Sequence, residues 1–252
     1  MLKVRIIPTL LYKDHGLVKG IGFDSWRRVG TALPAIKVYA ARQVDELILL
    51  DIAATRENRA VDFEEIDQLA DECFMPLTVG GGIRTVEDVR RLLRAGADKV
   101  AINSAAVENP ELIGGAAALA GSQCVVVSID VKQHADGRRE VWTHAGTRPA
   151  GRPPVEWARE AEARGAGEIL LTSIDQDGAM GGFDVDLIRA VSGAVSIPVI
   201  ASGGAGNYEH MRAAVQEGGA SAVAAASIFH FTQQTPLEAK AYLRQQGIPV
   251  RL

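Results

Sequence analysis

The sequence predicts an α/β fold, a (β/α)8 barrel built as a single domain over residues 1–252, and three observations support this. Short apolar runs alternate eight times with longer amphipathic segments, and no linker interrupts the alternation. A chain of 252 residues, 47% of them hydrophobic, can bury one large core. Length alone would suit two smaller domains equally well, but repeated strand-then-helix units favour one parallel barrel.

The strands and helices are expected in regular succession. The eight strand candidates are residues 5–7, 46–51, 76–79, 99–102, 124–130, 168–171, 198–201 and 221–224. Segments between them, such as 85–95, 153–164 and 209–217, carry apolar residues at helical spacing, and several end in glycine, a helix-stop signal. The polar insert 134–152, with a turn at Asp136-Gly137 and a second strand at 140–143, predicts a hairpin after the fifth strand.

The two halves of the chain repeat each other. Residues 76–82 resemble residues 198–204, and residues 94–104 resemble residues 217–227. The offset of about 122 residues is far longer than a solenoid repeat and predicts duplicated half-barrels in one TIM barrel. A ligand site in one half is then expected to have a counterpart in the other.

Charge and cysteine content narrow the classes of function. The net charge is -4 without a long basic run, which argues against a nucleic-acid or membrane-surface partner. Cys73 and Cys124 have neither disulfide-framework nor metal-site spacing, so both are expected to be reduced and structural. With no signal segment or membrane span in the sequence, we expect a cytoplasmic protein whose partner is a small molecule or another protein, with no metal or cofactor.

Glycines and small polar residues follow several of the predicted strands. One cluster combines residues 80–82 with Asn103 and Ser104, and the other combines Gly203 and Gly204 with Gly178 and Ser227. Glycine lets backbone N–H groups approach an anion closely, so each cluster can bind a phosphate. Tight turns would explain either cluster alone equally well. The recurrence in both halves favours two phosphate sites at the carboxyl ends of the strands.

Acidic residues end three strands: Asp51, Asp130 and the pair Asp175 and Asp177. Such a residue can transfer a proton, hold a substrate hydroxyl or cap the next helix, and capping is the commonest of these roles. Asp130 is the strongest catalytic candidate because it closes a long apolar run, and burial there would raise its pKa.

Charged residues also begin four strands: Arg5, Glu46, Lys99 and Glu168. They could form a ring of alternating charge at the floor of the barrel. Alternatively, they are charged only because the preceding loops are in water, and spacing alone slightly favours this second explanation.

Seven strings resemble the cyclase subunit of imidazole glycerol phosphate synthase: LTVGGGIR (77–84), AGADKV (95–100), INSAA (102–106), GSQC (121–124), GAGEILLTS (165–173), ASGGAG (201–206) and VRL (250–252). The resemblance implies a barrel that takes ammonia from a docked glutaminase subunit and cyclises a ribulosyl substrate with two phosphates.

The resemblance also assigns roles to residues of this chain. Asp130 would be catalytic, and the four strand-start charges would gate the entry of ammonia. Asp98 would lie at the glutaminase interface, and Lys19 in a mobile loop after the first strand. The residues implied for substrate or phosphate binding are Lys19, Asp51, Gly81, Gly82, Asn103, Ser104, Thr172, Asp177, Gly178, Gly203, Gly204, Ala226 and Ser227.

The chain departs from the family pattern after the first strand. The family reads Cys-Leu-Asp-Val-Lys-Asp-Gly-Arg where this chain reads TLLYKDHG (9–16), so Leu11 occupies the position of a catalytic aspartate. Residues 27–32 and Ala179 also differ from the usual pattern. These changes resemble a side branch associated with acetamidino modification of amino sugars in surface polysaccharide (lipopolysaccharide). That branch works with a glutaminase-like subunit and a separate sugar amidotransferase.

Three hypotheses follow from the sequence. The favoured one is an ammonia-receiving subunit of the side branch. The second is the cyclase of histidine biosynthesis, with Asp14 or a substrate group replacing the carboxylate missing at Leu11. The third is a non-catalytic barrel that binds a phosphorylated ligand and activates the glutaminase.

Overall fold

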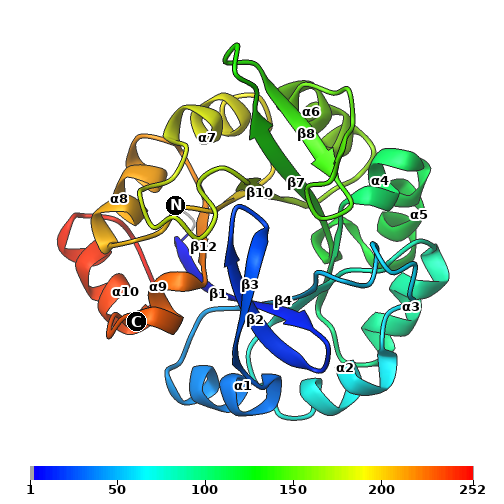
Figure 1. Ribbon diagram of the computed structural model, residues 1–252, viewed down its shortest axis with the longest axis horizontal. Coiled ribbons are helices and arrows are strands. Elements are labelled where there is room, and N and C mark those ends of the chain that lie inside the picture. Colours follow the sequence, from blue (N-terminus) through cyan, green and yellow to red (C-terminus); the bar gives the residue numbers. More distant parts are fainter. Residues whose placement is uncertain (1–2, 252) are drawn as a thin grey trace.

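Eight parallel strands close into a barrel ringed by helices in the computed structural model, which describes residues 3–251 (Figure 1). Neighbouring strands pair around the ring in the order β10, β11, β12, β1, β4, β5, β6, β7, and β7 pairs again with β10. The barrel strands are β1 (Arg5–Lys13), β4 (Leu47–Asp51), β5 (Leu77–Gly80), β6 (Lys99–Ile102), β7 (Val125–Gln133), β10 (Glu168–Ser173), β11 (Val199–Ser202) and β12 (Ala222–Ala225). All eight predicted strands are confirmed, and the last residue of the VRL string lies outside the described residues.

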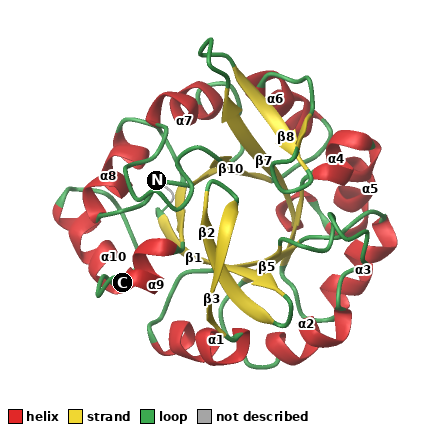
Figure 2. Ribbon diagram, in the orientation of Figure 1, coloured by secondary structure: helices red, strands yellow, loops and turns green. Residues whose placement is uncertain are grey.

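Helices cover the outside of the barrel between successive strands (Figure 2). They are α1 (Ala32–Ala41), α2 (Phe63–Ala70), α3 (Val86–Arg94), α4 (Ser104–Glu108), α5 (Glu111–Ala120), the short η1 (Ser122–Cys124), α6 (Pro154–Ala163), α7 (Val185–Ser192), α8 (Tyr208–Gln216), α9 (Ser227–Phe231) and α10 (Pro236–Gln245). The three helical segments singled out in the sequence are therefore confirmed. Helix α3 begins where predicted because of a capping box. The Thr85 side chain accepts a hydrogen bond from the backbone N–H of Asp88, and the Asp88 carboxylate accepts one from the backbone N–H of Thr85. Among the described residues, no helix is long and apolar enough to cross a membrane.

The core has two parts. The larger part lies between the strands and the helices, and the smaller fills the barrel lumen. The lumen residues are Ile7, Ile48, Ala101, Val126, Leu170, Ile200, Ala222 and Ala224, with Leu50 packed against them. This apolar layer separates the two ends of the barrel, which both carry polar groups.

Two hairpins extend the strands beyond the barrel. The predicted hairpin after the fifth strand is confirmed: β8 (Arg139–Thr143) pairs antiparallel with β7, and β9 (Arg148–Pro149) adds to it. The loop expected after the first strand is instead a second hairpin of β2 (Gly16–Ile21) and β3 (Asp24–Gly30). Its turn residues Asp14 and His15 both have positive φ, at 49° and 55°. Asn-Gly is the usual signal for such a turn, and its absence made the segment look like a loop. The hairpin crosses the middle of the ring in Figure 1.

The two halves repeat in three dimensions as well as in sequence. A Cβ atom added to Gly81 would lie 2.1 Å from the carbonyl oxygen of Asp51, and one added to Gly203 would lie 2.5 Å from that of Ser173. Both glycines have positive φ, 102° and 84°. Corresponding glycines thus let the backbone pass close to the neighbouring strand in each half, at a distance that no other residue would allow.

A buried ion pair fastens the last helix to the barrel floor. The Lys240 ammonium of α10 donates to Asp45 Oδ1 at 2.8 Å, and Asp45 Oδ2 accepts the backbone N–H of Ile6 at 3.0 Å. The side chains are only 3% and 2% exposed. Removing one member of such a pair leaves the other charge buried without its partner.

Lys240→Met is therefore expected to lower the free energy of unfolding by about 3 kcal/mol in urea denaturation. The double variant Lys240→Met/Asp45→Asn should regain part of that loss, because it removes the uncompensated charge. An unchanged unfolding midpoint in the single variant would contradict this account of the pair.

Candidate functional site

A cavity of about 400 Å³ opens at the carboxyl ends of the strands. Every residue to which the family resemblance assigns catalysis or substrate binding borders it. These are Leu11, Lys19, Asp51, Gly81, Gly82, Asn103, Ser104, Asp130, Thr172, Asp177, Gly178, Gly203, Gly204, Ala226 and Ser227. Residues far apart in the chain meet here because parallel strands in a closed barrel all end on one face.

Two cups with glycine and serine lie within this cavity. We call Gly82, Asn103 and Ser104 the first cup, and Gly178, Gly203, Gly204 and Ser227 the second cup. In the first cup, Ser104 Oγ accepts the backbone N–H of His144 at 2.9 Å. In the second, the Ser227 hydroxyl is buried and has no hydrogen-bond partner among residues 3–251. A buried hydroxyl without a protein partner is costly unless a ligand or water satisfies it, which fits an anion-binding role.

Asp130 is the buried acid of the site. It ends the barrel portion of β7, and its Oδ2 accepts a hydrogen bond from Asn103 Nδ2 at 2.9 Å. Burial, together with the nearby charge of Asp177, raises the pKa of Asp130 to about 7, against opposing hydrogen bonds from Ser128 and Thr172. The expectation of a raised pKa is thus met, and the group can both give and take a proton near neutral pH.

Leu11 gives the cavity an apolar wall on β1. Its neighbours across the sheet are Leu50 on β4 and Val18 on β2, so no carboxylate arises from the strands beside it at that level. Asp14, which the sequence offered as a substitute for the missing acid, is exposed in the β1–β2 turn and does not border the cavity. That part of the second hypothesis is wrong, because the hairpin carries Asp14 away from the mouth.

Lys19 and Asp177 join the β2–β3 hairpin to the loop after β10. The Lys19 ammonium donates to both carboxylate oxygens of Asp177, at 2.9 and 2.7 Å, and Lys19 is only 2% exposed. The backbone N–H of Gly22 also donates to the Asp177 carbonyl at 2.8 Å. The hairpin is therefore held against the loop that carries Gly178 of the second cup.

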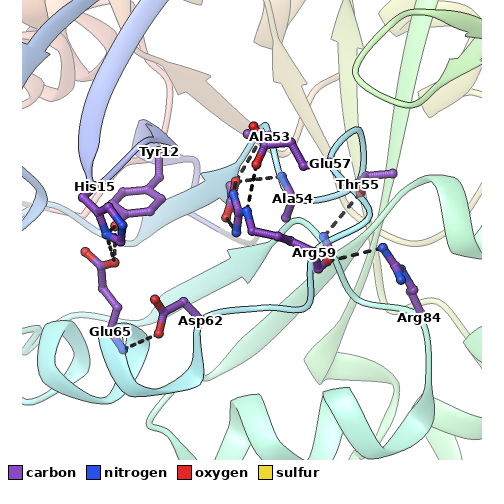
Figure 3. A network of polar contacts seen from close by, with 12 residues as sticks. Tyr12, His15, Ala53, Ala54, Thr55, Glu57, Arg59, Asp62, Glu65 and Arg84 are labelled. Atoms are coloured by element: carbon purple, nitrogen blue, oxygen red, sulfur yellow. Dashed lines mark hydrogen bonds and ion pairs between the residues drawn. The ribbon is translucent and has the colours of Figure 1, made fainter.

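Asp51 borders the cavity, but its carboxylate is engaged by its own loop. It accepts the backbone N–H groups of Ala53 and Ala54 at 3.0 Å each and pairs with the Arg59 guanidinium at 3.0 and 3.3 Å. Figure 3 shows Arg59 and the two alanines gathered in this network. Beside it, the Tyr12 hydroxyl donates to Glu65. Asp51 was expected to bind substrate. In the structure its carboxylate holds the β4–α2 loop through the hydrogen bonds to Ala53, Ala54 and Arg59.

The four strand-start charges form a closed ring at the opposite end of the lumen. Arg5 pairs with Glu46 at 2.6 Å and also with Glu168. Lys99 completes the ring by pairing with Glu46 at 2.7 Å and Glu168 at 2.9 Å. Asp98 is exposed at the start of β6 on this same floor. The ring, which spacing alone slightly disfavoured, is therefore present.

A further group of polar residues beside the first cup was not predicted from the sequence. Arg56 and Asn58 come from the β4–α2 loop, His144 comes from the turn between β8 and β9, and Arg148 begins β9. Neither loop carries a motif, and the two loops meet only in the folded barrel. No cluster of metal-ligand side chains occurs anywhere in residues 3–251.

Comparison with known proteins gives one family and close relatives. Residues 5–235 match the family described as histidine biosynthesis protein. Two relatives from Caulobacter vibrioides, strains NA1000 / CB15N and ATCC 19089 / CIP 103742 / CB 15, are both named imidazole glycerol phosphate synthase subunit HisF. Each is 54% identical to this chain over 253 residues, covering 100% of the chain and 97% of the relative.

Asp130 makes stability depend on pH. Its folded pKa of about 7 lies above the ordinary 3.8, so its contribution is complete below pH 4 and is lost as the pH rises through 7. Relative to the wild type, Asp130→Asn should gain up to about 4 kcal/mol between pH 4 and pH 8 in urea denaturation.

Asp136→Asn is the control for this measurement. Asp136 is exposed on the hairpin, and a hydrogen bond from Arg138 lowers its pKa, so its trend should be small and opposite in sign. A pH-independent difference between the wild type and Asp130→Asn would contradict the raised pKa.

Proposed function

The chain belongs to the histidine biosynthesis protein family, and on that premise we propose that it is the barrel subunit of an ammonia-using glutamine amidotransferase complex. We take the whole chain to act as one domain. The observation that best supports this proposal is the pair of polar sites at the two ends of one lumen. A cavity with two cups and a buried acid lies at the mouth, and a closed charge ring lies at the floor. These ends suit a substrate with two phosphates above and the entry of ammonia below.

The mouth supports chemistry on a substrate with two phosphate groups. The first and second cups come from corresponding places in the two half-barrels, so they would hold phosphates at opposite ends of an extended molecule. Asp130 lies between them on β7 with a pKa of about 7, so it can transfer protons to and from the middle of that molecule at neutral pH.

The floor supports the entry of ammonia. Small and branched apolar side chains fill the lumen above the ring, and a neutral ammonia molecule can pass such a layer far more easily than an ammonium ion. The ring bars the entrance while its four ion pairs are made, so passage requires at least one of them to open.

The same floor suits a glutaminase subunit as partner. Phe74 lies in the segment that leads into β5, and 85% of it is exposed. A large apolar side chain of this kind, next to the entrance and near the exposed Asp98, is typical of the buried centre of a protein interface.

The reaction of histidine biosynthesis is our first candidate for the chemistry. The relatives are named as subunits of imidazole glycerol phosphate synthase, and neither name refers to amino sugars. Formation of an acetamidino sugar, with a sugar amidotransferase as an additional partner, is the second candidate. The observation in its favour is the apolar wall at Leu11, which leaves Asp130 without a second acid from β1.

Turnover of the family's bisphosphate substrate with an ammonium salt separates these candidates. We expect slow but measurable turnover by the wild type and a loss of at least roughly 100-fold in Asp130→Asn. Leu11→Asp should increase the rate, because it restores an acid to the opposite wall.

Two other outcomes would contradict the first candidate. A silent wild type that still binds a glutaminase would favour the sugar branch. Glutaminase stimulation by the bisphosphate without its consumption would favour the non-catalytic barrel.

Phe74→Asp tests the proposed partner surface. In size-exclusion chromatography with the co-expressed glutaminase, the complex should weaken by roughly tenfold or more, because a charge would be buried at the interface. Leu237→Asp is the matched control, since Leu237 is also exposed, at 52%, but begins α10 at the opposite end of the barrel. Equal retention of the complex by both variants would exclude this surface.

A further inference from the structure

An open cleft of about 440 Å³ adjoins the first cup. One wall is Thr55, Arg56 and Asn58 of the β4–α2 loop. The other is His144 and Thr147 of the β8–β9 turn with Arg148, the first residue of β9. Thr55, Asn58 and His144 also border the main cavity, so the cleft is a lateral extension of the site. We call it the side cleft. All six of its residues carry polar or charged side chains.

The first wall of the side cleft is fixed relative to the first cup. Thr55 Oγ1 accepts the backbone N–H of Gly82 at 3.4 Å, which joins the loop directly to the cup. The Asp51 carboxylate holds the same loop through Ala53, Ala54 and Arg59, as Figure 3 shows for the labelled residues. Arg56 therefore projects from a loop that is tied down on both sides of it.

The second wall is fixed to the same cup by another contact. The backbone N–H of His144 donates to Ser104 Oγ at 2.9 Å, and the Thr147 hydroxyl donates to the His144 carbonyl at 2.8 Å. Arg148 Nη1 lies 3.2 Å from His144 Nε2, which accepts this bond when the imidazole is neutral. His144 and Ala145 have φ of 52° and 53°, a region that residues other than glycine rarely adopt.

The side cleft carries excess positive charge. Within residues 3–251, neither Arg56 nor Arg148 forms an ion pair with a carboxylate. Of the nearby acids, Glu57 pairs with Arg59, and Glu108 lies 3.5 Å from His144 Nε2. Arg56 and Arg148 line the same cleft from different segments, so an anion bound there would face two positive charges. Planar guanidinium groups are also the side chains best suited to bidentate binding of phosphate.

We propose that the side cleft is a third anion subsite, which binds the second phosphoryl group of a diphosphate whose first phosphoryl group occupies the first cup. The inference rests on the proposed phosphate site formed by Gly82, Asn103 and Ser104. One direct hydrogen bond joins the cup to each wall of the cleft. Gly82 makes this bond on one side and Ser104 makes it on the other. That proximity suits two phosphoryl groups that share a bridging oxygen. Phosphates at opposite ends of a long substrate would instead occupy the first and second cups.

Calorimetric titration with inorganic phosphate and inorganic pyrophosphate, at one fixed ionic strength, tests the side cleft. We expect the wild type to bind pyrophosphate at least tenfold more tightly than phosphate, because pyrophosphate engages the cup and both arginines. Arg56→Gln/Arg148→Gln should lose this preference and keep its affinity for phosphate.

The matched control is Arg94→Gln/Arg244→Gln. It removes the same charge from two exposed arginines at the ends of α3 and α10, on the opposite face of the barrel, and should keep the preference for pyrophosphate. Equal affinity of the wild type for the two anions, or a preference that survives Arg56→Gln/Arg148→Gln, would overturn the third subsite alone. Failure of the wild type to bind either anion would instead refute the phosphate cups, and the inference with them.

Discussion

Closure of eight parallel strands is the constraint on which the rest of this molecule depends. β12 pairs with β1, with Arg5 opposite Ala222, and this pairing turns an open sheet into a barrel. Side chains alternate along a strand, so Ile7, Thr9 and Leu11 face the lumen on the same side as Arg5. One strand therefore runs from the charge ring to the cavity. The closed geometry keeps a polar floor and a polar mouth on one axis, with an apolar layer between them.

The duplicated halves are alike in backbone and unlike in chemistry. Gly81 and Gly203 make the same close approach to the preceding strand, so both halves can form a cup. The catalytic candidate Asp130 on β7 has no acidic counterpart in the other half, because β1 carries Leu11 at the cavity wall. Burial and the nearby charge of Asp177 make Asp130 the one carboxyl among the described residues whose pKa is raised to about 7.

Prediction from sequence succeeded where local pattern and barrel topology were enough. Apolar runs located all eight strands, and their carboxyl ends located both cups. The charge ring needed the folded barrel, because spacing cannot show that Arg5 and Glu168 meet. The β2–β3 hairpin was missed because Asp14-His15 is an unusual turn sequence. Asp51 borders the cavity as expected, but its hydrogen bonds to the following loop could not be predicted from local sequence.

The raised pKa of Asp130 links proton uptake to ligand binding. At neutral pH the population of barrels is a mixture of protonated and ionised forms, because the pKa is about 7. On the proposal that each cup holds a phosphate, the bound dianion would add negative charge near this carboxyl and favour its protonated form further. On the same proposal, each binding event would draw a fraction of a proton from the buffer onto Asp130. The proton is thereby a second ligand of the barrel, whose binding to Asp130 is coupled to that of the phosphate.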